Sequence, residues 1–172
     1  MGKGEHNYSQ SLYDVAAAIT SARTREDVLQ SIVENVAKAM NARGCSLMLL
    51  TPDRTMLLHT AVYGLSRWYV NKGRVSADKS ISDALKGKAT AILDATTDKR
   101  IQYKLEAKRE GVASILSSPM MLRDEIIGVI RVYTGEPRHF TRDDFTFIGT
   151  VANLGAIALE HTRQETTAIK SE

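Results

Sequence analysis

The chain has 172 residues, with 23 basic and 20 acidic side chains and a formal net charge of +3. Hydrophobic residues make up 43% and charged residues 25%, which is typical of a single folded domain and excludes a disordered chain. The positive excess is too small and too scattered along the sequence to indicate a nucleic-acid-binding protein.

The chain opens with two predicted helices. In the first, apolar residues recur at helical spacing, namely Leu12, Val15, Ala16 and Ile19. Ser11 and Asp14 form a capping box that predicts the start of this helix. In the second, Thr24 and Asp27 mark the start of a broad apolar stripe, and Gly44 precedes the first strand.

A hairpin and an irregular middle region follow. The hairpin consists of two apolar runs, residues 45–50 and 56–64, around a turn sequence. The middle region is expected to hold short elements: an aromatic segment at 65–70, a strand near 74–77, a helix over 80–88, a strand at 90–95 and a helix at 104–111. These elements are too short to form a layer of long helices.

The last third is regular again. Residues 112–122 and 125–133 predict a second hairpin that turns at Arg123 and Asp124. A long helix is expected from Thr141, with Asp144 three residues later, to about Arg163, and its apolar residues cover more than one stripe. This order predicts an α+β fold: a mainly antiparallel sheet with the long terminal helices on one face and the irregular middle on the other.

Four segments occur in an order that resembles the GAF domain, a small-molecule-sensing module of signalling proteins: AVYGL, ILDATTDKR, SPMMLRDEIIGVIRVY and FTRDDFTFIGTVANLGAIALE. Asp94, Pro119, Gly128 and Phe140 stand where the family has its characteristic residues. The resemblance implies a central antiparallel sheet of five or six strands and a ligand cavity between the sheet and the middle region. It divides the chain into a flanking helix at 1–23, a sensor domain at 24–160 and a tail at 161–172, which is polar or begins a connecting helix.

Departures from the patterns of particular members exclude some ligands. Members that bind cyclic nucleotides have Asn-Lys after the last strand, where this chain has Tyr133 and Thr134. Bilin-binding members attach the chromophore to a cysteine in the middle region, which has none here. Members that reduce free methionine sulfoxide use several cysteines, whereas Cys45 is the single cysteine of this chain and lies in an apolar run.

Residues for catalysis or metal binding are not grouped in the sequence. The four histidines are far apart and show no ligand spacing. His59 is expected to share one face of its strand with Leu57 and Ala61, where a hydrogen-bonded structural histidine is favoured over a ligand of haem or metal. We therefore expect a protein that is not an enzyme, and the residues name no cofactor.

Candidate ligand-binding residues lie in the middle region. Trp68, Tyr69 and Tyr103 could form the wall of a cavity, or they could only fix loops to the sheet. Ser80 and Ser82, at the start of the short helix, stand near free backbone N–H groups that could hold an anionic group, although the same residues suit an ordinary helix cap.

Arg131 is the most unusual residue of the second hairpin, because it interrupts the apolar run IIGVIRVY. Alternation groups Ile127, Val129, Arg131 and Tyr133 on one face, which is expected to line the cavity. A buried guanidinium requires a partner. Either a carboxylate of the middle region such as Asp94, or a bound carboxylate or phosphate, would supply it.

The function predicted from these residues is a non-catalytic sensory domain of a signal-transduction protein, such as a sensor kinase, a cyclic-dinucleotide enzyme or a transcriptional regulator. It would bind an unidentified small molecule, form a homodimer through its terminal helices and pass ligand occupancy through them to a covalently linked output domain. The alternative is a structural dimerisation module with a collapsed cavity. No apolar run approaches the ~18 residues of a membrane span, so we expect a cytoplasmic domain without direct membrane insertion.

Overall fold

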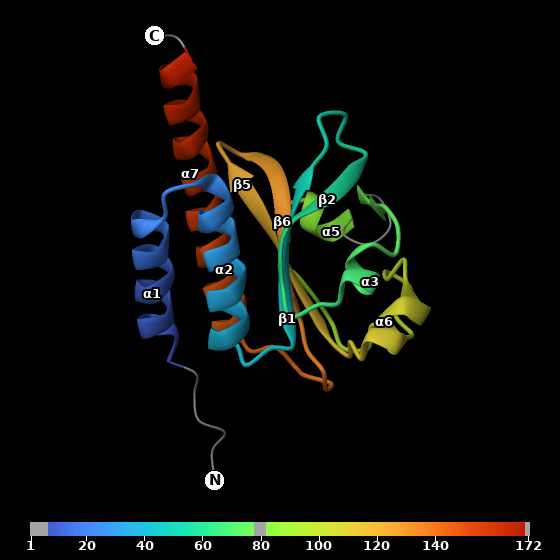
Figure 1. The fold of residues 1–172 in the computed structure, drawn as a ribbon. Helices are drawn as coiled ribbons and strands as arrows, with labels where there is room; N and C mark the ends of the chain where they lie inside the picture. Colours follow the sequence, from blue (N-terminus) through green and yellow to red (C-terminus); the bar gives the residue numbers. More distant parts are fainter. Residues whose placement is uncertain (1–6, 78–81, 171–172) are drawn as a thin grey trace.

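The computed structural model describes residues 7–77 and 82–170 (Figure 1). Its helices are α1 (Tyr8–Ser21), α2 (Arg25–Ala39), α3 (Arg67–Val70), α5 (Ser82–Leu85), α6 (Lys104–Glu110) and α7 (Arg142–Lys170). Its strands are β1 (Gly44–Leu50), β2 (Met56–Tyr63), β3 (Val75–Ser76), β4 (Thr90–Ile92), β5 (Ile115–Leu122) and β6 (Glu125–Tyr133). The predicted sequence of long and short elements is confirmed.

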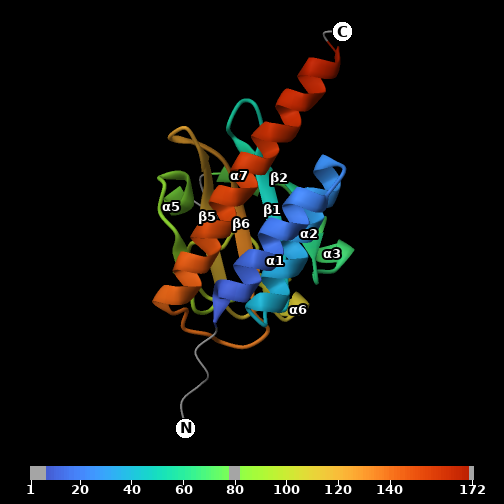
Figure 2. The ribbon, with the colours of Figure 1, turned by 90° about the vertical axis from the view of Figure 1, so that its left-hand side faces the viewer.

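The six strands form one antiparallel sheet in the order β3-β2-β1-β6-β5-β4. Helices α1, α2 and α7 lie on one face, and Figures 1 and 2 show the short helices α3, α5 and α6 on the other. We call these the helix face and the pocket face. The predicted α+β, GAF-like architecture is therefore correct.

Side-chain caps define the starts of the long helices. The Asp27 N–H donates to Thr24 Oγ1 at the start of α2. At the start of α7, the Asp144 N–H donates to Thr141 Oγ1 and the Thr141 N–H donates to Asp144 Oδ2, which is the predicted capping box. The cap predicted for α1 was wrong: the helix begins one turn earlier, where Asn7 Oδ1 accepts from the Ser9 N–H. Asn7 satisfies a free donor of the first turn equally well.

Two bulges change the predicted alternation of side chains. The register of β1 and β2 shifts between Leu47 and Met48, which leaves Thr60 as an extra residue of β2. Consequently Ala61 packs in the helix-face core while His59 points to the pocket face, so the two do not share a face as predicted. In β6 the extra residue is Ile127, which packs on the helix face and not with Arg131.

The helix face carries the larger apolar core. It joins α1, α2 and α7 to β1, β5 and β6, with Leu47, Leu116 and Ile130 fully buried from the strands. Figure 2 shows α1 in front of α2 and alongside α7. The Tyr8 ring stacks on Phe147, with 4.2 Å between ring centroids. The first helix of the same chain, α1, therefore covers part of the apolar surface of α7, one of the terminal helices through which a homodimer was predicted.

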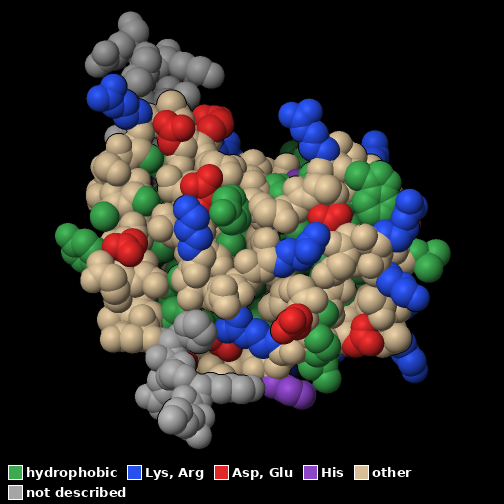
Figure 3. Space-filling model, turned by 60° about the horizontal axis from the view of Figure 1, so that its bottom comes forward, with side chains coloured by type: hydrophobic (Ala, Val, Ile, Leu, Met, Phe, Trp, Pro, Cys, Tyr) green, Lys and Arg blue, Asp and Glu red, His purple; other side chains and the backbone are tan. Residues whose placement is uncertain are grey.

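α7 extends well beyond the sheet at its C-terminal end (Figure 2). Its exposed side includes Asn153 and Ile157, and 61% of the Ile157 surface remains open. None of the helices in the described ranges is both long and apolar enough to cross a membrane. On the face shown in Figure 3, basic side chains are interspersed with acidic ones, so this face presents no continuous surface of one sign.

Candidate functional site

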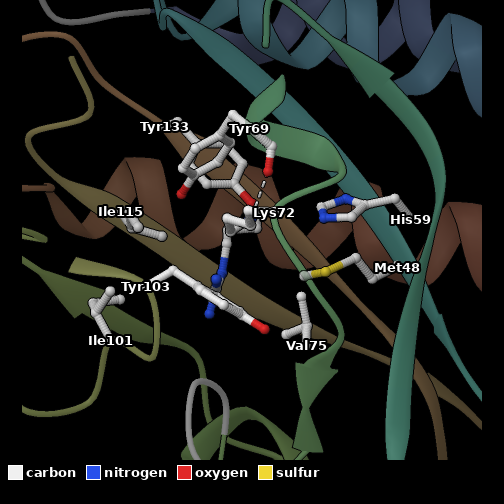
Figure 4. A pocket seen from close by; sticks show the side chains of 10 residues that line it. Met48, His59, Tyr69, Lys72, Val75, Ile101, Tyr103, Ile115 and Tyr133 are labelled. Atoms are coloured by element: carbon white, nitrogen blue, oxygen red, sulfur yellow. Dashed lines mark hydrogen bonds between the residues drawn. The ribbon is translucent and has the colours of Figure 1, made fainter. Parts of the chain in front are cut away.

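A pocket lies between the pocket face of the sheet and the middle region (Figure 4). Its volume is about 310 Å³ including the space at its mouth. Strands β1, β2, β3, β5 and β6 contribute to it, together with α3 and the segments that follow α3 and precede α6. The lining residues are Met48, His59, Tyr69, Lys72, Val75, Ile101, Tyr103, Ile115, Arg131 and Tyr133.

Arg131 and Tyr133 lie on the central strand β6, and their side chains point to the pocket face. Arg131 is 6% exposed, and its Nε donates to Ser117 Oγ on β5 at 3.1 Å. The Tyr133 hydroxyl lies 3.1 Å from Ser46 Oγ on β1. Arg131 and Tyr133 therefore lie on the face of β6 that was predicted to line the cavity. Serine side chains on the neighbouring strands β5 and β1 hold the two side chains in place.

Lys72 enters the pocket just after α3. Its Nζ donates to the Tyr69 carbonyl oxygen at 3.0 Å and lies 3.8 Å from the centre of the Tyr69 ring and 5.4 Å from that of Tyr103. Burial, and then the charge of Arg131, lower the pKa of Lys72 to about 8. The tyrosine rings stabilise the ammonium group, since the ring faces are electron-rich, but they do not neutralise it.

His59 faces Lys72 from β2 (Figure 4). Both of its ring nitrogens are buried and have no hydrogen-bond partner among the described residues. Burial, and then the charges of Lys72 and Arg131, lower the pKa of His59 to about 4, so the ring is neutral at pH 7. The hydrogen bond predicted for His59 was wrong, because its ring lies among the pocket residues and neither ring nitrogen meets a partner among the described residues.

The outer wall is closed by a contact between Tyr103 and the segment before β3. The Tyr103 hydroxyl donates to the Arg74 carbonyl oxygen at 2.7 Å. Gly73 permits this approach, because a Cβ there would lie 2.4 Å from the Tyr103 hydroxyl and the backbone has φ +151°. Tyr103 therefore holds β3 over the pocket.

Trp68 and Asp94 do not line the pocket. The Trp68 side chain is 45% exposed and stacks with Arg109, whose Cζ lies 4.8 Å from the ring centre. Asp94 is exposed, and its Oδ1 accepts from the N–H and the hydroxyl of Thr96. It forms a local turn of the kind aspartate favours and does not face Arg131.

The anion site expected at the start of α5 stays a prediction. Ser80 lies outside the described residues, as does the side chain of Ser82, which begins α5.

Sequence reasoning missed two polar residues of the pocket, His59 and Lys72. Lys72 follows a helix of four residues, and so short an element gives no periodic pattern from which a direction could be inferred. Apolar lining residues such as Met48 and Ile115 were assigned to strands, but the pattern of strands alone does not show where a cavity forms. The available signal for Lys72 was its position as a single basic residue in a short polar segment, Asn71-Lys72-Gly73.

The arrangement suits binding better than covalent chemistry. Cys45 is buried on the helix face, and burial raises the pKa of its thiol, so the thiolate nucleophile is disfavoured. The described residues include no group of three or more His, Cys, Asp or Glu side chains placed to hold a metal ion. The pocket itself is narrow: its interior, without the space at the mouth, has room for about one water molecule.

The architecture and the position of the pocket agree with comparisons to known proteins. The profile of the GAF domain family matches residues 22–160. The chain belongs to the GAF domain family. GAF domains are generally sensory and non-catalytic, and they bind small-molecule ligands such as bilins.

Individual relatives support the same family. The chain is 25% identical over 165 residues to the methyl sulfide methyltransferase-associated sensor of Methanosarcina acetivorans, covering 92% of this chain but 16% of that protein. Among solved structures, the GAF domain of a phosphoenolpyruvate-protein phosphotransferase from Coxiella burnetii has a TM-score of 0.83 at 21% identity, covering 94% of this chain and 97% of that one. The GAF domain of the corresponding Acinetobacter protein has a TM-score of 0.78 at 21% identity, covering 92% and 96%. These likenesses concern the fold.

Proposed function

We propose that this GAF domain is a cytoplasmic, non-catalytic sensory domain that binds a small molecule in the pocket and transmits its occupancy through α7. The observation that carries the proposal is a buried, polar and incompletely hydrogen-bonded pocket wall. His59 has two buried ring nitrogens without partners among the described residues, and it faces the ammonium group of Lys72. Buried polar groups are normally satisfied, so a site of this kind favours a ligand that supplies the missing partner.

Transmission has a short physical route. Arg131 and Tyr133 contribute to the pocket from β6, and α7 packs against β5 and β6 on the opposite face. A ligand that displaces these strands therefore changes the surface on which α7 rests, and packed helices respond to such changes by small shifts. The relative from Methanosarcina acetivorans is a sensor far longer than this chain, which supports a linked output domain.

The alternative is a structural dimerisation module. The narrowness of the pocket favours it, since room for about one water molecule is less than a ligand requires. Dimerisation would use the outer side of α1, where Tyr13 is 69% exposed, and the exposed side of α7 around Ile157. In the sensory role, the pocket must open by displacement of Tyr103 or Lys72.

Native mass spectrometry of the purified chain tests the proposal. We expect an added mass of a small molecule in the wild type, and its loss in Val75→Phe, which fills the pocket. Leu58→Phe is the matched control, because Leu58 lies on the neighbouring strand and is 55% exposed. An unliganded dimer whose dissociation is unchanged by Val75→Phe would favour the structural role.

A further inference from the structure

Positive charge is concentrated in the pocket. The charge of Arg131, from β6, lowers the pKa of Lys72, from the segment after α3, and both charges act on His59 of β2. Glu106 and Glu110 of α6 oppose this effect on Lys72. Glu110, however, is occupied by Ser66, whose N–H and hydroxyl donate to its carboxylate at 2.8 and 2.6 Å.

Lys72 has no direct counter-charge among the described residues. The ion pairs among the described residues are Arg100–Asp98, Arg123–Glu160 and Arg138–Asp144, and none includes Lys72. Its Nζ is held by one carbonyl oxygen and two aromatic rings. An ammonium group has three donors, so Lys72 retains hydrogen-bonding capacity toward a further acceptor.

The remainder of the pocket wall is apolar. Met48, Val75, Ile101 and Ile115 are all buried and line the pocket beside the charged groups. A ligand that satisfied only the charges would leave these side chains against water or polar atoms. The wall therefore matches a molecule with a charged end and a short hydrocarbon end.

We propose that the ligand of this pocket is a small organic monoanion, a carboxylate with a short apolar body. Its carboxylate accepts from Lys72 Nζ and lies on the side of the pocket formed by His59 and Arg131. Its hydrocarbon part lies between Met48, Val75 and the two isoleucines. This inference rests on the proposed function, since it assumes that the pocket binds a small molecule.

Other ligand classes fit less well. A cation would add positive charge next to Lys72 and Arg131, which is unfavourable at close range in a buried site. An uncharged molecule would leave that repulsion in place. Inorganic phosphate would match the charge but would set its strongly hydrated oxygens against the apolar wall.

A shape-matched pair of probes that differ in charge tests the proposal in the wild-type protein. Butyrate and butyramide have nearly the same shape and differ in charge, and their affinities can be measured by protein-detected NMR titration at pH 7. We expect butyrate to bind at least about tenfold more tightly than butyramide, which corresponds to about 1.4 kcal/mol. Acetate and phosphate, as further probes, should both bind more weakly than butyrate.

Variants assign the preference to Lys72. Lys72→Met keeps most of the side-chain volume and should remove the preference for butyrate over butyramide, while Lys108→Met, at an exposed position of α6, should retain it. In the wild type, butyrate affinity should fall between pH 7 and pH 9. Lys72 loses its proton in that range, because burial and Arg131 lower its pKa to about 8. Bound carboxylate stabilises the charged form and shifts the midpoint upward.

The outcomes separate this inference from the proposed function. Equal affinity for the two probes, or a preference that persists in Lys72→Met, overturns the anion assignment. A neutral or cationic molecule retained in native mass spectrometry also overturns it but leaves the sensory role standing. If no probe binds and no molecule is retained, both are overturned. Backbone chemical-shift dispersion of each variant shows that the fold is intact.

Discussion

The two faces of the sheet are built on different principles. On the helix face, α1, α2 and α7 bury a large cluster of mainly aliphatic side chains. On the pocket face, short helices cover two small apolar clusters, and between them lie His59, Lys72 and Arg131. The first face supplies cohesion by hydrophobic burial, and the second retains polar groups whose burial opposes folding.

The helix face also buries a charged residue, Asp144. Its carboxylate accepts from the Tyr8 hydroxyl, the Thr141 N–H and Arg138. Burial would raise the pKa of Asp144, yet these partners outweigh it and lower the pKa below its usual value. A buried charge with a full set of partners is structural, whereas His59 lacks such a set. This contrast supports the proposal that the pocket around His59, and not the surroundings of Asp144, is a binding site.

Neighbouring residues of β1 provide the strongest test of this difference. Leu47 points to the helix face and Met48 to the pocket face, and both are fully buried. We expect Leu47→Ala to lower the free energy of unfolding by about 3–4 kcal/mol and Met48→Ala by about 2 kcal/mol, because a residue beside an existing space loses fewer contacts. Urea denaturation measures both values. Equal losses would show that the pocket face is packed as tightly as the helix face.

Acid titration tests the unpartnered histidine. The folded pKa of His59 is about 4, below the unfolded value, so the folded state favours the neutral ring. The corresponding stability is present above pH 6.5 and is lost as the pH falls toward 4, by about 2 kcal/mol. His59→Gln should lose less stability over this range, and His139→Gln, at an exposed position, should behave like the wild type. If the free energy of unfolding fell equally with pH in all three proteins, the loss of stability could not be assigned to His59.

The smallest expected effect is a gain in stability. The folded pKa of Lys72 is also lowered, so its favourable contribution is present above pH 10.5 and is lost as the pH falls to about 8. At pH 7, Lys72→Met should therefore increase the free energy of unfolding by about 1 kcal/mol, after allowance for partial solvent access and one lost hydrogen bond. The gain should shrink at pH 9.5. A loss of stability at pH 7 would mean that Lys72 is structural.

The same contrast explains what could be predicted from sequence. The helix face follows from periodic burial, so the presence of the long helices, the two hairpins and the cap at Thr141 were predicted correctly. The predicted ends were less accurate, because α1 begins one turn earlier and α7 continues to Lys170, beyond the predicted end near Arg163. Of the candidate site, Tyr69, Tyr103, Arg131 and Tyr133 do line the pocket. Trp68 does not, because the direction of a side chain on the single-turn helix α3 depends on tertiary contacts and not on periodicity.

The remaining errors have local causes. Asp94 accepts hydrogen bonds within its own turn, and any aspartate in a loop can do the same. The faces of Ala61 and Ile127 were wrong because one extra residue in a strand reverses the alternation beyond it, and no residue type marks such a bulge reliably.

The extra residue at Thr60 also has a mechanical consequence. A bulge bends its strand and increases the local twist, and the bent half of β2 is the part that carries β3. Val75 on β3 therefore reaches the pocket from this bent half of the sheet edge, where Tyr103 holds the neighbouring Arg74. We expect deletion of Thr60 to straighten this edge of the sheet and to move β3 relative to the rest of the pocket wall. The position of one pocket wall would then depend on a solvent-exposed residue that does not itself line the pocket.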